Sequence, residues 1–274
     1  MKIISWNVNG IRSVFRTTFK DWLKSSNPDI VCLQEIKADY KELDKEYTEI
    51  DGYYAYFNSS KLKKGHAGVA IYTKLKPISV ETVLGIERFD NEGRCLKLTF
   101  KDFILFNFYI PHGSRDKHDL PYKIKVYEKL IPKLKDISDK EVILTGDFNI
   151  AHKEIDVFHA KQNFNNTMFT QEERNLLENI TNLNYTDTFR KKYPDKKEYS
   201  WWPYMGNLRG KNIGGWRIDY IYVSKSLENK VKEAFTGREI LGSDHGPIGI
   251  ILDKEIEIEE IPIYEKIEPQ ASLF

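Results

Sequence analysis

The feature that most constrains the fold is an alternation of short apolar, β-branched runs with segments of helical periodicity, which is typical of chains that combine sheets and helices. Several of the predicted strands follow one another through short hairpin-like connections, which favours mixed sheets over purely parallel ones. The predicted strands are Lys2–Trp6, Ile30–Gln34, Val69–Tyr72, Leu96–Phe100, Phe103–Ile110, Val142–Thr145, Ile218–Val223 and Ile248–Leu252.

Three segments between these strands carry apolar stripes at helical spacing. The first is expected to end before Asn27-Pro28. The third begins at Thr170, which can form a capping box with Glu173 because the hydroxyl and the carboxylate satisfy each other's backbone donors. The stripes consist of Phe15, Phe19, Trp22 and Leu23; of Ile124, Tyr127, Leu130, Ile131 and Leu134; and of Leu176, Leu177, Ile180 and Leu183.

The 274 residues contain no internal repeat and no interior linker, which predicts one catalytic domain over residues 1–252. Residues 253–274 form a tail with seven acids and two lysines, a net charge of −5, so residues 1–252 carry +6 within the total of +1. This basic excess is compatible with phosphate binding without being evidence for it.

Cys32 and Cys95 lie far apart inside apolar segments, and we expect both to be reduced core residues, which suits an intracellular protein. The chain begins without a basic run followed by a long apolar stretch, and no apolar run approaches the length of a membrane span. We therefore expect a cytoplasmic, nucleoid-associated protein with no membrane partner.

Polar residues gather where the predicted strands begin or end. A rigid sheet holds such side chains while they face solvent, which suits a site for a hard cation. Each is weak evidence alone, because Gly146-Asp147-Phe148-Asn149 is also a common turn composition and Tyr109 is more often a core residue. Their joint occurrence is informative. The residues are Asn7, Glu35, Tyr109, Asp147, Asn149, Asp219, Asp244 and His245.

Other chemistries fit the sequence less well. It contains no Gly-x-Ser-x-Gly nucleophile elbow, no His-Glu-x-x-His and no paired Cys-x-x-Cys. Among the histidines only His245 adjoins a carboxylate at a strand entrance, and the role of His112 stays open.

Taken together, five motifs resemble those of the exonuclease III family of apurinic/apyrimidinic endonucleases, over roughly residues 1–252. They are Ser5-Trp6-Asn7-Val8-Asn9-Gly10, Leu33-Gln34-Glu35, Gly146-Asp147-Phe148-Asn149, Gly215-Trp216-Arg217-Ile218-Asp219-Tyr220 and Gly242-Ser243-Asp244-His245. The resemblance implies an α+β fold, a four-layer sandwich of two mixed β-sheets flanked by helices, like deoxyribonuclease I. It also implies Mg²⁺-dependent hydrolysis of double-stranded DNA 5′ to an abasic site, leaving a 3′-hydroxyl, with Mn²⁺ as a substitute ion. The resemblance further implies that the same enzyme has 3′–5′ exonuclease and 3′-phosphodiesterase activities.

The resemblance also implies roles for individual residues. Glu35 would be the principal Mg²⁺ ligand, helped by Asn7 and Asp244, while Asp147 would handle the proton of the attacking water or of the leaving oxygen. The wider metal-site set is Asn7, Glu35, Asp147, Asn149, Asp244 and His245. The remaining catalytic roles are phosphate binding by Asn149 and Tyr109, and orientation of His245 by Asp219.

The sequence departs from the family pattern at two places. Asn9 stands where animal-type members carry an aspartate, which should weaken the affinity for the metal or shift its position, although bacterial-type relatives share the asparagine. Gly214-Gly215 makes the segment before Trp216 one residue longer than expected.

Aromatic and basic residues crowd the segment between Tyr199 and Arg217, which favours a loop that inserts into a DNA groove and encloses a flipped-out sugar. For Trp201 and Trp202, core packing is an equal alternative. The predicted DNA contacts are Arg209, Lys211, Trp216 and Arg217.

Two alternatives stay open at this point. One is another phosphoesterase of the same fold, acting on an inositol lipid, sphingomyelin or poly(A); the other is a non-catalytic DNA-binding scaffold. The form of Trp216-Arg217-Ile218-Asp219 and the capped helix at Thr170 favour the repair enzyme, which we expect to be a monomer.

The chain ends in Gln270-Ala271-Ser272-Leu273-Phe274, which resembles the peptide by which DNA-processing proteins bind a sliding clamp. Gln270 would enter a polar pocket, and Leu273 and Phe274 an apolar one. The alternative is a frayed terminus or one that packs back on the domain.

Overall fold

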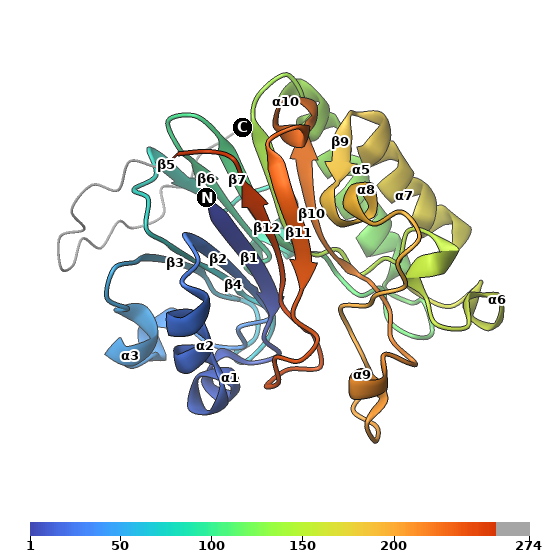
Figure 1. Cartoon of the computed structure of the whole chain (residues 1–274), viewed down its shortest axis with the longest axis horizontal. Helices are drawn as coiled ribbons and strands as arrows, with labels where there is room; N and C mark the ends of the chain where they lie inside the picture. The colour runs from blue at the N-terminus through green and yellow to red at the C-terminus, as the bar shows by residue number, and fades with distance from the viewer. Residues whose placement is uncertain (256–274) are drawn as a thin grey trace.

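Two six-stranded β-sheets lie face to face at the centre of the molecule (Figure 1). The structure is a computed structural model and describes residues 1–255. The first sheet has the order β11-β12-β1-β2-β4-β3, with β1 Lys2–Asn7, β2 Ile30–Gln34, β3 Tyr54–Asn58, β4 Val69–Thr73, β11 Val231–Thr236 and β12 Ile248–Leu252. The second has the order β5-β6-β7-β8-β10-β9, with β5 Ser79–Glu81, β6 Cys95–Thr99, β7 Ile104–Tyr109, β8 Val142–Asp147, β9 Tyr185–Asp187 and β10 Asp219–Ser224.

Each sheet contains one parallel pair, β1 with β2 and β7 with β8, beside antiparallel neighbours. The carboxyl ends of the two strands in a parallel pair lie at the same edge of their sheet. Asn7 at the end of β1 reaches Asp147 at the end of β8, so these edges of the two sheets adjoin. The predicted architecture of two mixed sheets flanked by helices is confirmed.

The space between the sheets changes from apolar to polar along the strands. Side chains alternate between the two faces of a strand, so every second residue of β8 points the same way. Ile143 belongs to the inter-sheet core, Thr145 is buried beyond it, and Asp147 ends the strand. Thr145 pairs with the buried Asn107 on the neighbouring strand β7, and the buried Gln34 of the first sheet donates to the side chains of Asn107 (2.7 Å) and Ser5 (2.9 Å).

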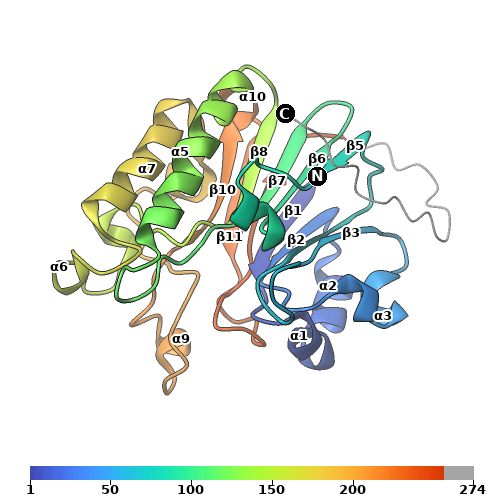
Figure 2. The same ribbon diagram turned by 180° about the vertical axis from the view of Figure 1, so that it is seen from behind.

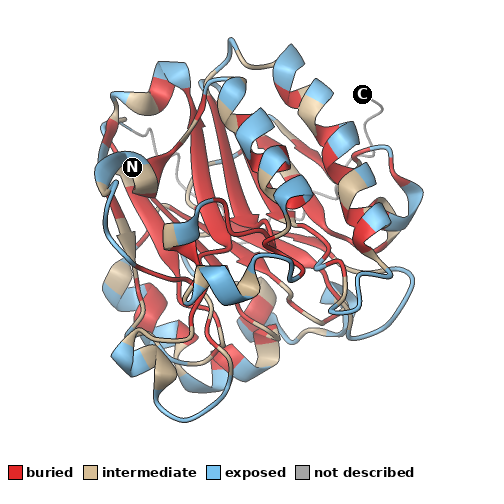
Figure 3. Ribbon diagram, turned by 90° about the vertical axis from the view of Figure 1, so that its right-hand side faces the viewer, coloured by how far each residue is buried: buried red, intermediate tan, exposed pale blue. Residues whose placement is uncertain are grey.

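Helices cover the outer face of each sheet (Figures 1 and 2). α1 (Ile11–Thr17), α2 (Phe19–Ser26) and α3 (Lys45–Thr48) pack on the first sheet, and α5 (Leu120–Asp136) and α7 (Gln171–Asn182) on the second. Figure 3 shows the buried strands between helices whose outer faces are exposed. The shorter helices are η1 Tyr40–Glu42, α4 Glu87–Asn91, η2 Glu154–Asp156, α6 Ala160–Asn163, α8 Thr188–Lys192, α9 Leu208–Lys211 and α10 Lys225–Glu228.

The prediction of a single helix for the first apolar stripe is wrong, because the segment forms two helices. The stripe from Phe15 to Leu23 belongs to two helices, because Thr18 adopts φ −125° and interrupts the chain between α1 and α2. The stripe survives the break, since the rings of Phe15 and Phe19 still stack at 4.3 Å. The predicted capping box at Thr170 is confirmed, with both reciprocal hydrogen bonds present.

Within residues 1–255, no helix combines the length and the apolar character that crossing a bilayer requires. The predicted clamp peptide and most of the acidic tail lie outside the described residues.

Candidate active site

The site lies where strand ends of both sheets meet. Asp147 ends β8 and Asp219 begins β10, and the two residues face each other as antiparallel partners. The backbone N–H of Asp219 donates to the buried Ser200 hydroxyl at 3.1 Å, which fixes the start of β10. A pocket of about 490 Å³ opens here. Its lining residues are Glu35, Tyr109, His112, Arg115, Asp147, Asn149, Asn166, Thr167, Met168, Trp201, Trp216, Ile218, Asp244 and His245.

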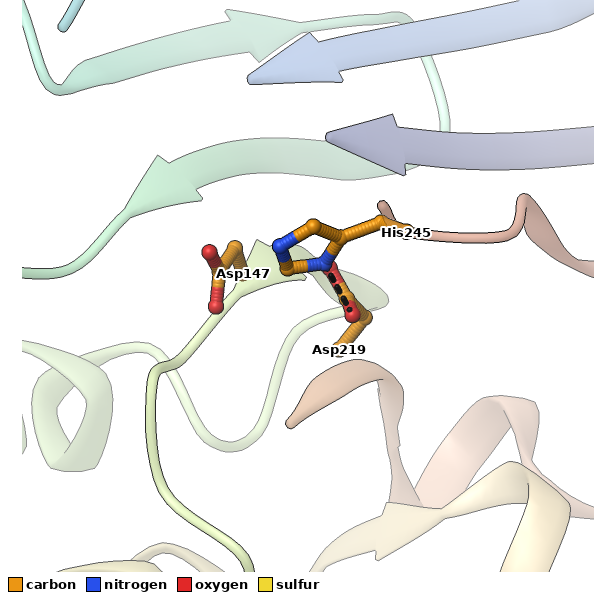
Figure 4. A group of neighbouring side chains, drawn as sticks. All are labelled: Asp147, Asp219 and His245. Atoms are coloured by element: carbon orange, nitrogen blue, oxygen red, sulfur yellow. Dashed lines mark hydrogen bonds and ion pairs between the residues drawn. The ribbon is translucent and has the colours of Figure 1, made fainter. Parts of the chain in front are cut away.

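A buried triad of ionisable groups lies at the pocket (Figure 4): Asp147 and His245 line it, and Asp219 is hydrogen-bonded to His245. His245 Nδ1 lies 2.9 Å from Asp219 Oδ2, and the other ring nitrogen is turned toward Asp147. The three side chains offer ligand atoms within 4.8 Å of one another, close enough to share a metal ion.

The pKa values of two members of the triad, His245 and Asp147, are raised. Burial disfavours a protonated imidazole, but the carboxylates of Asp219, Asp147 and Asp244 outweigh it and raise the pKa of His245 to about 10. Burial and the Asp219 carboxylate raise the pKa of Asp147 to about 7, although His245 acts in the opposite direction. His245 is therefore a cation at neutral pH, while Asp147 can exchange a proton there.

Asn7 and Asn149 hold the Asp147 carboxylate in place. Asn7 Nδ2 donates to Asp147 Oδ2 at 2.9 Å and to Glu35 Oε2 at 3.1 Å, so a single amide joins two carboxylates. Asn149 adopts φ 51° and donates to Asp147 through its backbone N–H (2.9 Å) and its side chain (3.1 Å).

A second group of oxygen ligands surrounds Asn9. Its Nδ2 donates to Asp244 Oδ1 at 2.9 Å, its Oδ1 accepts from Lys37, and Lys37 pairs with Glu35 at 2.9 Å. Trp201 Nε1 donates to the other oxygen of Asp244 at 3.0 Å. Carboxylate oxygens are the ligands that Mg²⁺ and similar hard cations prefer, so Glu35 and Asp244 fit such an ion. The side chain of Glu35 retains 19% exposure toward the pocket.

Tyr109 lies on the pocket wall at the end of β7. The Arg94 guanidinium stacks 4.5 Å from the centre of its ring and donates to its carbonyl at 3.1 Å. Burial and the Glu35 carboxylate raise the pKa of Tyr109 well above its usual value, so the hydroxyl stays protonated and can donate. His112, whose role the sequence left open, lies on the same wall, and burial and Lys123 lower its pKa.

Arg217 is the clearest error among the predicted DNA contacts. Its side chain is 2% exposed, and its guanidinium binds Asp156 at 2.8 Å and Asp187 at 2.7 Å. Neighbouring residues of an extended segment face opposite ways, so Trp216 lines the pocket while Arg217 points into the protein.

Arg209, another predicted DNA contact, is half-buried. Its guanidinium donates to the backbone carbonyls of Gly237, Arg238, Ile240, Ser243 and His245, and thereby supports the loop that carries Asp244. Lys211 is exposed on α9. Trp216 is 8% exposed and packs its ring against Phe169, so it serves both the core and the pocket.

The sequence reading missed a buried ion pair behind the pocket. Lys123 and Glu173 are fully buried, and Lys123 Nζ donates to Glu173 Oε1 (2.6 Å), Asn149 O (2.5 Å) and His112 O (3.1 Å). The signal was available, because Lys123 lies four residues before Tyr127 on the apolar stripe of α5. A lysine at such a position needs a buried partner.

The chain matches the sequence model of the endonuclease/exonuclease/phosphatase family over residues 4–245. It is 38% identical to an exodeoxyribonuclease of Bacillus subtilis over 92% of this chain and all of that protein. It is 39% identical to a DNA-(apurinic or apyrimidinic site) endonuclease of Dictyostelium discoideum over 92% of this chain and 71% of the relative. Among solved structures, an AP endonuclease from Archaeoglobus fulgidus superposes with a TM-score of 0.85 at 28% identity, covering 93% of this chain and 100% of the other.

Proposed function

The chain belongs to the endonuclease/exonuclease/phosphatase family, and from this we propose that it is a DNA-repair apurinic/apyrimidinic endonuclease. It hydrolyses the phosphodiester 5′ to an abasic site in duplex DNA and leaves a 3′-hydroxyl. The observation that carries the proposal is the buried pair of Asp147 and His245 in a pocket that Trp201 and Trp216 also line, with Asp219 hydrogen-bonded to His245. The exodeoxyribonuclease name of the Bacillus relative supports 3′-exonuclease action at the same site.

The charges of the triad divide its roles. A pKa of about 7 suits Asp147 to accept the proton of the attacking water, since a general base works best near the ambient pH. The cationic His245, held by Asp219, donates to a phosphate oxygen and stabilises the charge that grows in the transition state. Asn149 and Tyr109 contribute further donors to the same phosphate.

Glu35, Asn7 and Asp244 would hold the divalent ion, which we assign as Mg²⁺ with Mn²⁺ as a substitute. When bound, the ion supplies neutralisation of the phosphate charge. We place it on this group in preference to the triad because a protonated His245 carries a hydrogen on both ring nitrogens and so has no free lone pair for a metal. Asp147, Asn149 and His245 would lie around the ion without serving as its main ligands.

The apolar wall of the pocket would receive the abasic sugar. Trp216→Ala removes the ring that packs between Phe169 and the opening, and we expect KM for abasic duplex to rise by an amount equivalent to about 1–3 kcal/mol. Steady-state kinetics against the abasic duplex would measure this. If the Trp216→Ala variant is mainly unfolded, Trp216 serves the core and not the binding of the sugar.

A duplex with a single tetrahydrofuran analogue of an abasic site tests the function as a whole. We expect one cut 5′ to the analogue in the presence of Mg²⁺ and none in EDTA. Cleavage of inositol lipid, sphingomyelin or poly(A) alone would show that the chain is a phosphoesterase from another branch of the family. Binding of the abasic duplex without cleavage would show that it is a non-catalytic DNA-binding scaffold.

The pentapeptide at residues 270–274, outside the described residues, would bind the sliding clamp through Gln270, Leu273 and Phe274. We expect a dissociation constant on the order of micromolar, lost on deletion of these residues, with cleavage of short abasic duplexes unchanged. Calorimetry with the clamp of the source organism would decide this, and absence of heat with the full chain would end the proposal.

A further inference from the structure

Trp201 lies between the segment that carries Trp216 and the loop that carries Asp244. Its backbone exchanges two hydrogen bonds of 2.9 Å with Trp216, and the next residue donates from its N–H to the Asp244 carbonyl at 3.0 Å. The backbone around Trp201 is thus held from both sides, which fixes the direction in which the indole points.

The indole of Trp201 has two neighbours of different kinds. It lines the pocket beside Trp216, and its Nε1–H donates to Asp244 Oδ2 at 3.0 Å. Asn9 Nδ2 donates to the other oxygen at 2.9 Å. The Ser243 hydroxyl also donates to Oδ1, at 3.3 Å. Hydrogen bonds to both oxygens restrain the rotation of the carboxylate, and its two oxygens offer about four acceptor sites, which leaves capacity for a cation.

We propose that Trp201 is a positioning residue for the divalent-metal site, because its indole N–H fixes the carboxylate of Asp244. One side chain would then form part of the pocket wall and also set the affinity for the metal. The proposal rests on the proposed function for the identity of the pocket's ligand, whereas its metal-binding part can be tested without DNA.

Hydrogen bonds to a metal-binding carboxylate orient it, and their loss commonly weakens metal binding by about 10–100-fold. Because the same indole would touch the sugar, the binding of metal and of abasic DNA would be coupled through Trp201, and such a coupling changes both affinities by the same factor.

The test is Trp201→Phe, which keeps an aromatic ring and removes the N–H. Calorimetric titration with Mg²⁺, without DNA, is expected to show about tenfold weaker binding than in the wild type. Trp216→Phe is the matched control, since that indole lines the same pocket and its N–H has no hydrogen-bond partner among residues 1–255. Its Mg²⁺ affinity should be unchanged.

An unchanged Mg²⁺ affinity in Trp201→Phe would overturn the proposal. If that variant does not fold, the wild type still provides a test: the indole N–H resonance of Trp201 should shift on addition of Mg²⁺, and an unmoved resonance would contradict the assignment. Weaker metal binding in a variant of a protein that never cuts abasic duplex would reject the proposed function and leave the role of Trp201 standing.

Discussion

His245→Asn is expected to lower kcat on abasic duplex by about 10²–10³-fold, the usual loss when one donor to a developing negative charge is removed. The substitution removes the cation that Asp219 orients at 2.9 Å. Single-turnover cleavage at saturating DNA and Mg²⁺ would measure the effect, and circular dichroism would confirm that the variant is folded.

Asp219→Asn gives the corresponding test of orientation. If the carboxylate acts through the imidazole, the double variant should lose little more than His245→Asn alone, since residues that act as a unit are not additive. Two losses that multiply in the double variant would separate the residues and assign Asp219 a function of its own.

Arg217→Met should lower the free energy of unfolding by about 3–5 kcal/mol, because it leaves the buried carboxylate of Asp187 without its cation and leaves Asp156 with Arg190 alone. Urea denaturation would measure the loss. Lys211→Met is the control, since it removes an exposed positive charge from α9 and should leave stability nearly unchanged.

Combining Arg217→Met with Asp187→Asn should restore part of the lost stability, since a neutral amide is less costly to bury than an unpaired carboxylate. A variant of Arg217 with wild-type stability and weakened DNA binding would reinstate the residue as a DNA contact.

The strands that the sequence predicted best are those buried on both faces. β2 and β12 have the bounds predicted for them, because a short apolar run that contains β-branched residues favours a strand over a helix. β11 escaped detection because exposed Lys232 and Glu233 interrupt its apolar residues, and β5 and β9 are only three residues long. Such strands depend on pairing with a neighbour, which a local pattern does not record.

The sequence likewise predicted some features of the site and not others. The motifs identified Asp147, Asp219 and His245, and the structure brings them together as one buried group. The direction of Arg217 and the hydrogen-bond partner of the Trp201 indole depend on contacts between distant segments, so residue type alone could not determine them.

The pairing of Asp147 with Asp219 on neighbouring antiparallel strands limits how the distance between the two carboxylates can vary. Two carboxylates that face each other across antiparallel strands repel, and the cationic His245 between them offsets that repulsion. Their separation follows from the fixed spacing of a hydrogen-bonded strand pair, and a slip of one residue would turn one acid to the outer face of the sheet. Strand register can change only by whole residues. Substitutions around the site can therefore change the pKa values of the two acids, but they cannot change the distance between them gradually.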